Sequence, residues 1–147
     1  MEINNRIREQ VISDLKVGMV TDSGDPMVAT FFNGLPAFIE VPEMEGYEGD
    51  IPAVAVAIND GQPVDEDFEE ITWQAVLTVR IYLVADNHTD PELDAFGQKV
   101  LSVVGKHYSA NGLISLCNRR GFDYERDDEQ PWGMLDLAFT IEYTEEV

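Results

Sequence analysis

The amino-acid sequence predicts an α+β fold, with a mostly antiparallel or mixed β-sheet and two main helices packed on one face. The first reason is the order of the periodic segments, which runs helix, hairpin, strand, strand, helix, strand, strand. Helices therefore do not alternate one-for-one with strands, as they do in parallel α/β folds. The second reason is that the 147 residues contain no internal repeat and no linker, which fits a single domain over residues 1–147.

The first element predicted is an amphipathic helix over residues 3–17. Apolar side chains recur at helical spacing, and charged side chains lie on the other faces. The apolar positions are Ile3, Ile7, Val11 or Ile12, and Leu15. Gly18 is the expected end of the helix, because glycine is favoured just past a helix C-terminus.

A hairpin is predicted around Asn33-Gly34, between residues 29–32 and residues 37–39. Both turn residues tolerate the positive φ that tight hairpin turns require. Pro36 cannot donate a ladder hydrogen bond, so a longer turn is also compatible with the sequence. Residues 52–58 are apolar, with alternating Ala and Val, and predict a buried strand.

The longest predicted strand covers residues 71–85 and follows an acidic loop over residues 60–70. One face of this strand is apolar from Trp73 to Leu83, and the other face is mainly polar. A last strand over residues 132–143 shows the same alternation.

A second helix is predicted to start at Asp90-Pro91-Glu92, with Asp90 as its N-cap and proline at its first position. Its apolar stripe begins at Leu93 and ends near His107. Residues 113–118 are predicted to form a short helix, and residues 122–126 are predicted to form a strand.

The composition excludes several classes of function. Acidic residues outnumber basic residues 29 to 9, which gives a formal net charge of −20. A chain this acidic lacks the basic surface that binds nucleic-acid phosphates or an anionic membrane. The longest apolar run, residues 53–58, is far shorter than the ~18 residues of a membrane span. The single Cys117 cannot form an internal disulfide, which favours folding in the cytoplasm.

No catalytic or metal-binding motif is found in the sequence. Counted from Asp65, a calcium loop would need glycine and glutamate where Glu70 and Val76 stand. This segment is therefore predicted to be a solvated acidic loop that binds divalent cations at most loosely. His88 and His107 are not at zinc-motif spacing, and His107 is predicted to be a core or boundary residue of its helix. The protein is not expected to be an enzyme.

Several stretches occur in an order and spacing that resemble the minor tail protein U family, the tail terminators of lambda-like siphophages. They are ATFFNGLPA at 29–37, DIPAVAV at 50–56, TWQA at 72–75, PELDA at 91–95, GFDYERDD at 121–128 and the ending IEY at 141–143. The resemblance extends over residues 3–143, and the departures lie in loops, where residues 42–49 are longer than the family pattern.

The resemblance implies a subunit that assembles as a homo-hexameric ring on the head-proximal end of a tail tube. The ring would stop the addition of tube subunits and offer its other face to the head-completion or connector protein. Its partners would be further copies of itself, the tail tube protein, the end of the tape measure protein and that connector. DNA would pass through the lumen without specific binding. The expected location is the virion tail, after assembly in the host cytoplasm, without a membrane.

The resemblance implies no cofactor, although loosely bound divalent cations could promote assembly of so acidic a chain. The alternative is an acidic protein that mimics DNA and occupies a nucleic-acid-binding partner. Such a protein would also be small, acidic and without catalytic activity. The two functions differ in assembly, because a mimic acts as a monomer or dimer and a terminator must form a ring.

Scarce cations mark the candidate interface. Only nine basic residues serve this acidic chain, so those at an interface are expected to bind carboxylates of a neighbouring subunit. The predicted cations are Arg119 and Arg126. The predicted acids are Asp65, Asp67 and Glu70, or Asp127 and Asp128. An ion pair within the same chain is the alternative for each arginine.

Overall fold

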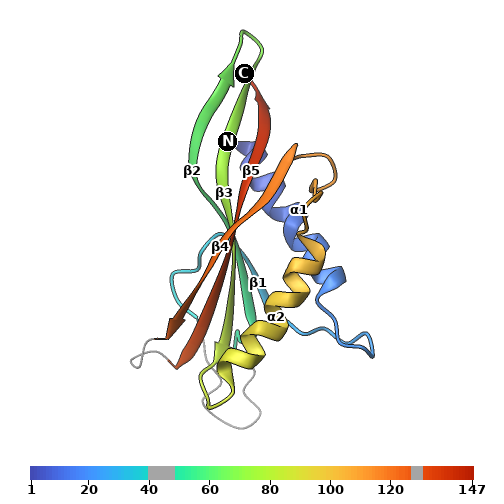
Figure 1. The fold of residues 1–147 in the computed structure, drawn as a ribbon, viewed down its shortest axis with the longest axis vertical. Coiled ribbons are helices and arrows are strands. Elements are labelled where there is room, and N and C mark those ends of the chain that lie inside the picture. Colours follow the sequence, from blue (N-terminus) through green and yellow to red (C-terminus); the bar gives the residue numbers. More distant parts are fainter. Residues whose placement is uncertain (40–48, 127–130) are drawn as a thin grey trace.

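The computed structural model describes residues 1–39, 49–126 and 131–147, and it contains two helices and a five-stranded mixed sheet (Figure 1). The elements are α1 (Glu2–Gly18), β1 (Thr30–Asn33), β2 (Ala53–Glu66), β3 (Glu70–Val84), α2 (Thr89–Val103), β4 (Leu116–Arg126) and β5 (Trp132–Glu146). The sheet order is β1-β2-β3-β5-β4. Among the described strands, β1 and β2 pair in parallel and the other neighbouring strands pair antiparallel. The predicted α+β class is confirmed.

Both helices cover one face of the sheet (Figure 1). Their apolar stripes and the apolar faces of β2, β3 and β5 form one core cluster. Apolar positions of the predicted helices and strands are buried, among them Ile7, Leu15, Val54, Val56, Leu77, Val79, Val100, Leu137 and Phe139. The two helices approach each other closely at Gly18, where a Cβ atom would lie 2.2 Å from Cγ2 of Val103.

The opposite face of the sheet has a smaller apolar cluster and an ion pair. The cluster comprises Ile39, Ile51, Ala53, Ala55 and Tyr82. Beside it, Arg80 donates from Nε and Nη2 to the two carboxylate oxygens of Asp136, at 2.6 and 2.8 Å. Arg80 and Asp136 are cross-strand neighbours on β3 and β5, so the pair links the two central strands.

The hairpin predicted around Asn33-Gly34 is wrong. Residues 37–39 form no strand, and β1 pairs instead with Ala53–Val56 of β2. The Gly34 amide then donates to the Val56 carbonyl at 2.7 Å. The Asn-Gly pair does turn the chain, with φ of +94° at Gly34, but the partner strand comes from more distant sequence. Local turn propensity cannot identify such a partner.

The acidic loop predicted over residues 60–70 is also wrong, because most of it is strand. β2 continues to Glu66 and β3 begins at Glu70, so only residues 67–69 lie between them. Figure 1 shows this hairpin extending beyond the rest of the fold. Every side chain of residues 59–70 is exposed, so burial imposes no alternation on the sequence there.

Asp90 is not the N-cap of the second helix. The helix begins at Thr89 and is preceded by His88. The Thr89 hydroxyl accepts from the Asp86 amide at 2.7 Å and donates to the Asp86 carbonyl at 2.9 Å, and the helix starts two residues earlier than predicted. The Asp90 carboxylate binds Arg126 instead.

The short helix predicted over residues 113–118 is wrong as well. β4 begins at Leu116, where Cys117 is buried in the core opposite Ile141. The strand predicted over residues 122–126 is confirmed as the second half of β4. His107 is exposed and lies beyond the end of α2 at Val103, so the prediction of a core or boundary position is also wrong.

Candidate assembly surface

The two edges of the sheet are the surfaces on which assembly through backbone pairing is possible. On one side, β4 pairs with β5 alone among the described strands, so its other edge is open. On the other side, β1 covers the outer edge of β2 as far as Val56. Beyond Val56, this outer edge of β2 has no strand next to it in the described part of the chain. Unpaired strand edges present N–H and C=O groups that can pair with another chain.

The β2–β3 hairpin carries three of the predicted interface acids. Asp65 and Glu70 are exposed on its two strands, and Asp67 organises its turn. The Asp67 carboxylate accepts the backbone amides of Glu69 and Glu70 at 2.8 and 2.9 Å. These bonds to the charged form lower the pKa of Asp67 below its ordinary value of 3.8.

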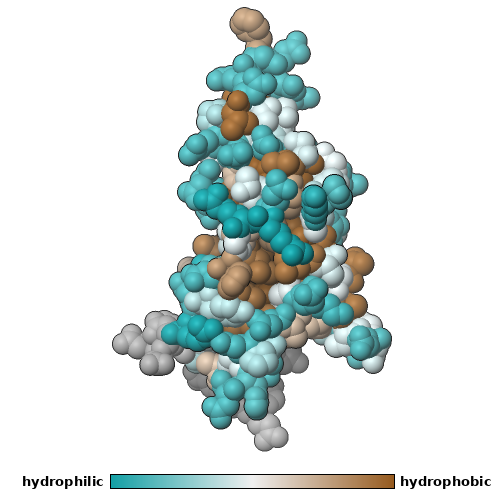
Figure 2. Space-filling model, in the orientation of Figure 1, coloured by the Kyte–Doolittle hydropathy of each residue, from teal (hydrophilic) through white to brown (hydrophobic). Residues whose placement is uncertain are grey.

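Phe68 is fully exposed in this turn, between the acids of the hairpin. Figure 2 shows two small apolar groups among hydrophilic side chains at one end of the molecule, one of them at the tip, and a larger apolar zone across the middle of the same face. A fully exposed aromatic ring is typical of a protein-binding contact when it protrudes from a rigid element. Sequence analysis missed Phe68, although a lone aromatic residue within an acidic run is visible in the sequence.

We expect Asp67→Ala to loosen the hairpin turn while leaving the body of the domain folded. The two amides that Asp67 holds would exchange faster with deuterium, which can be measured by NMR or mass spectrometry. In the wild type, the lowered pKa means that the carboxylate stabilises the turn at pH values above 3.8. That contribution is lost as the pH falls through the folded-state pKa. Unchanged exchange at both amides would contradict this role.

The two predicted arginines differ in their surroundings. The Arg126 guanidinium binds Asp90, with Nε at 2.9 Å from Oδ1, and lies over the Tyr124 ring, 4.8 Å from its centroid. Arg119 is exposed on the β4 edge and makes no ion pair among the described residues. Asp127 and Asp128 lie outside the described residues. Whether any of these residues contacts a neighbouring subunit remains a prediction.

Sequence analysis missed two neighbours of Arg119 on β4. Arg120 is exposed and adjacent to it, within a β-bulge between Arg119 and Gly121. The ring of Phe122 is 71% exposed, and it meets Tyr124 edge-on at 5.7 Å. The pattern of two arginines, glycine and phenylalanine in so acidic a chain is the sequence feature that could have identified this edge.

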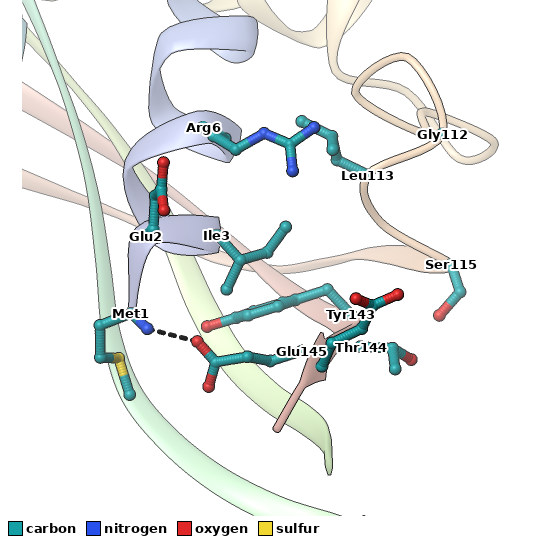
Figure 3. Close-up of a pocket in the computed structure, with 11 residues that line it drawn as sticks. Met1, Glu2, Ile3, Arg6, Gly112, Leu113, Ser115, Tyr143, Thr144 and Glu145 are labelled. Atoms are coloured by element: carbon teal, nitrogen blue, oxygen red, sulfur yellow. Dashed lines mark hydrogen bonds and ion pairs between the residues drawn. The ribbon is translucent and has the colours of Figure 1, made fainter. Parts of the chain in front are cut away.

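A hollow of about 820 Å³ lies between the start of α1, residues 112–115 and the end of β5 (Figure 3). The Met1 amine is paired there with the Glu145 carboxylate, which also accepts the Trp73 indole N–H at 3.1 Å. Both bonds lower the pKa of Glu145, the amine contributing more. The described residues that line the hollow include no His or Cys, so its lining offers no imidazole base to activate a nucleophile.

The described ranges contain no group of three His, Cys, Asp or Glu side chains that could hold a metal ion. The only cysteine, Cys117, is buried, and burial raises its thiol pKa to about 11, so it stays protonated and unreactive at neutral pH. Neither helix in the described residues is long and apolar enough to span a membrane.

Comparisons with known proteins agree with the fold and its extent. The tail tube terminator protein of Escherichia phage N15 is 34% identical over 139 residues, covering 93% of this chain and 95% of that protein. The tail tube terminator protein of Escherichia phage lambda is 35% identical over 117 residues, covering 78% and 83%.

A chain from the virion of a native gene transfer agent particle has a TM-score of 0.63 at 11% identity, with 94% of each chain covered, which shows a shared fold. The family described as phage minor tail protein U matches residues 2–143, almost the whole chain, from the start of α1 to Tyr143 within β5. The chain therefore belongs to the phage minor tail protein U family.

Proposed function

We propose that this protein is a tail terminator that assembles as a ring on the head-proximal end of the tail tube. The ring stops further addition of tube subunits and presents its other face to the head-completion protein. The observation that carries this proposal is the near full-length similarity to two proteins named tail tube terminator. Membership of the family locates the protein in the tail of the virion.

The two sheet edges support a ring rather than a twofold dimer. They lie on opposite sides of the sheet and differ in sequence, so a contact between them is head-to-tail. Head-to-tail contacts generate closed rings when the rotation between copies closes. Capping and docking require only complementary surfaces, and the protein has no turnover in this role.

The charge of the chain fits a conduit for DNA. A subunit with a net charge of −20 repels phosphates, whereas a basic lumen would retain them. The DNA would thus pass through the ring without specific binding. The proposed contacts are with further copies of this chain, the tube protein, the end of the tape measure protein and the connector.

Adding the protein during tube assembly is expected to hold tubes at a uniform length, with a ring at one end. Electron microscopy of tubes assembled with and without the protein measures both features. A matched amount of another acidic protein controls for charge alone. Tubes that keep growing in its presence, together with a free protein that stays monomeric or dimeric, would contradict the proposal. That result would favour the acidic DNA mimic.

A further inference from the structure

Two β-bulges of opposite charge lie at the same level on the two edges of the sheet. On β2, the register shifts between Asn59 and Gln62, around Asp60, whose φ is +58°. On β4, it shifts between Arg119 and Gly121, around Arg120. The two bulges lie at the same position along the strands, because the register runs across the sheet from Ile58 to Leu77, Phe139 and Arg119.

The charged side chains at these bulges are free in the isolated subunit. Asp60, Arg119 and Arg120 are all exposed. In the described part of the chain, none of the three takes part in an ion pair or a side-chain hydrogen bond. Arg80 and Arg126, by contrast, are already neutralised by Asp136 and Asp90. Exposed arginines without an internal partner are suited to bind another molecule.

The strand directions allow the two edges to pair between copies. β2 is antiparallel to β3, β3 to β5, and β5 to β4, so β2 and β4 run in opposite directions. Rotation of a copy about an axis along the strands preserves these directions. The β4 edge of one copy would then meet the β2 edge of the next as an antiparallel pair, with the bulges side by side.

We propose that the β4 edge of each subunit binds the free β2 edge of a second copy, with Arg119 and Arg120 contacting Asp60 across the boundary. The contact rests on the proposed ring and specifies how its subunits join. The bulges fix the register, because only one alignment brings the opposite charges together. Asp67 lies in the turn and Glu70 on β3, off the β2 edge that makes this contact, so both stay available to other partners.

A charge-swap experiment tests the pairing. One variant carries Arg119→Glu with Arg120→Glu, and the other carries Asp60→Lys. Each alone juxtaposes like charges at every boundary, and the protein concentration needed for rings should rise at least about tenfold. In an equimolar mixture, each boundary again joins opposite charges. Rings should re-form with the two variants alternating, which native mass spectrometry detects as equal numbers of each.

Matched controls separate this contact from general charge and folding effects. Lys99→Glu with Lys106→Glu makes the same change in net charge away from both edges, and Asp22→Lys is the control for Asp60→Lys. Both controls should form rings as the wild type does. Recovery in the mixture also shows that both swapped variants are folded.

The outcomes distinguish this inference from the proposed function. Suppose that the wild type forms rings. If either swapped variant alone also forms them unimpaired, or if the mixture does not recover them, the pairing is overturned and the proposed function stays intact. A wild-type protein that forms no ring in solution and none on tube ends would overturn both.

Discussion

Leu77→Ala is expected to lower the free energy of unfolding by about 2–5 kcal/mol, the range for truncating a buried leucine. Leu77 is fully buried at the centre of β3, with Ile58 on one side and Phe139 on the other. A cavity there is held open by two hydrogen-bonded neighbouring strands, so the surroundings cannot collapse into it. The loss is a large share of the ~5–15 kcal/mol that stabilises a typical domain.

Urea unfolding followed by circular dichroism measures this loss. Leu35→Ala is the matched control, because it removes the same atoms from a side chain that is 49% exposed. Its cost should be about 1 kcal/mol or less, since a half-exposed leucine gains little from burial. Equal costs at Leu77 and Leu35 would refute the assignment of β3 as the central core strand.

Ring assembly is expected to depend strongly on ionic conditions, with the free protein monomeric at low salt. A ring of six copies, as the resemblance implies, would bring together a formal charge of 6 × −20, or −120. Their repulsion extends over about 30 Å at 0.01 M salt but only about 8 Å at physiological ionic strength. Added salt should therefore favour the ring, and divalent cations should do so more efficiently by loosely occupying acidic surfaces such as the hairpin.

A finished tube end should favour the ring in the same way, because it holds neighbouring subunits in place. A cap that is monomeric when free and a ring when docked would not be wasted as empty rings. Sedimentation velocity across a magnesium titration, with sodium chloride adjusted to constant ionic strength, separates cation binding from screening. A hexamer that persists unchanged in about 10 mM buffer without divalent cations would show that interface contacts outweigh repulsion.

The sequence predicted only some of the residues on the candidate assembly surface. The scarcity of basic residues pointed to Arg119 and Arg126 as interface residues. The sequence did not predict that Arg126 binds Asp90 within the same chain. The acids of residues 65–70 were expected in a loop, whereas they extend a hairpin whose turn Asp67 stabilises. The sequence did not predict Asp60 as an interface residue. Its position level with the β4 bulge, on the other edge of the sheet, depends on the register of four strands.

The sequence by itself determined the elements that burial organises. The strands around Leu77 and Phe139 and the helix around Ile7 each bury one face, and burial imposes a period of two or 3.6 residues on the sequence. The net charge of −20 likewise follows from composition alone. Such features depend on residues close together in the sequence or on composition, so the amino-acid sequence alone is enough to predict them.

Only the tertiary structure decided the conformation of the segments whose side chains are exposed to solvent on both faces. Residues 59–66 and 118–121 are exposed on both faces, so nothing in their sequence alternates. They are strands because a neighbouring strand supplies hydrogen bonds, and the parallel pairing of β1 with β2 arises in the same way. These exposed segments also form the edges proposed for assembly, since backbone groups left unpaired by one subunit remain available to the next.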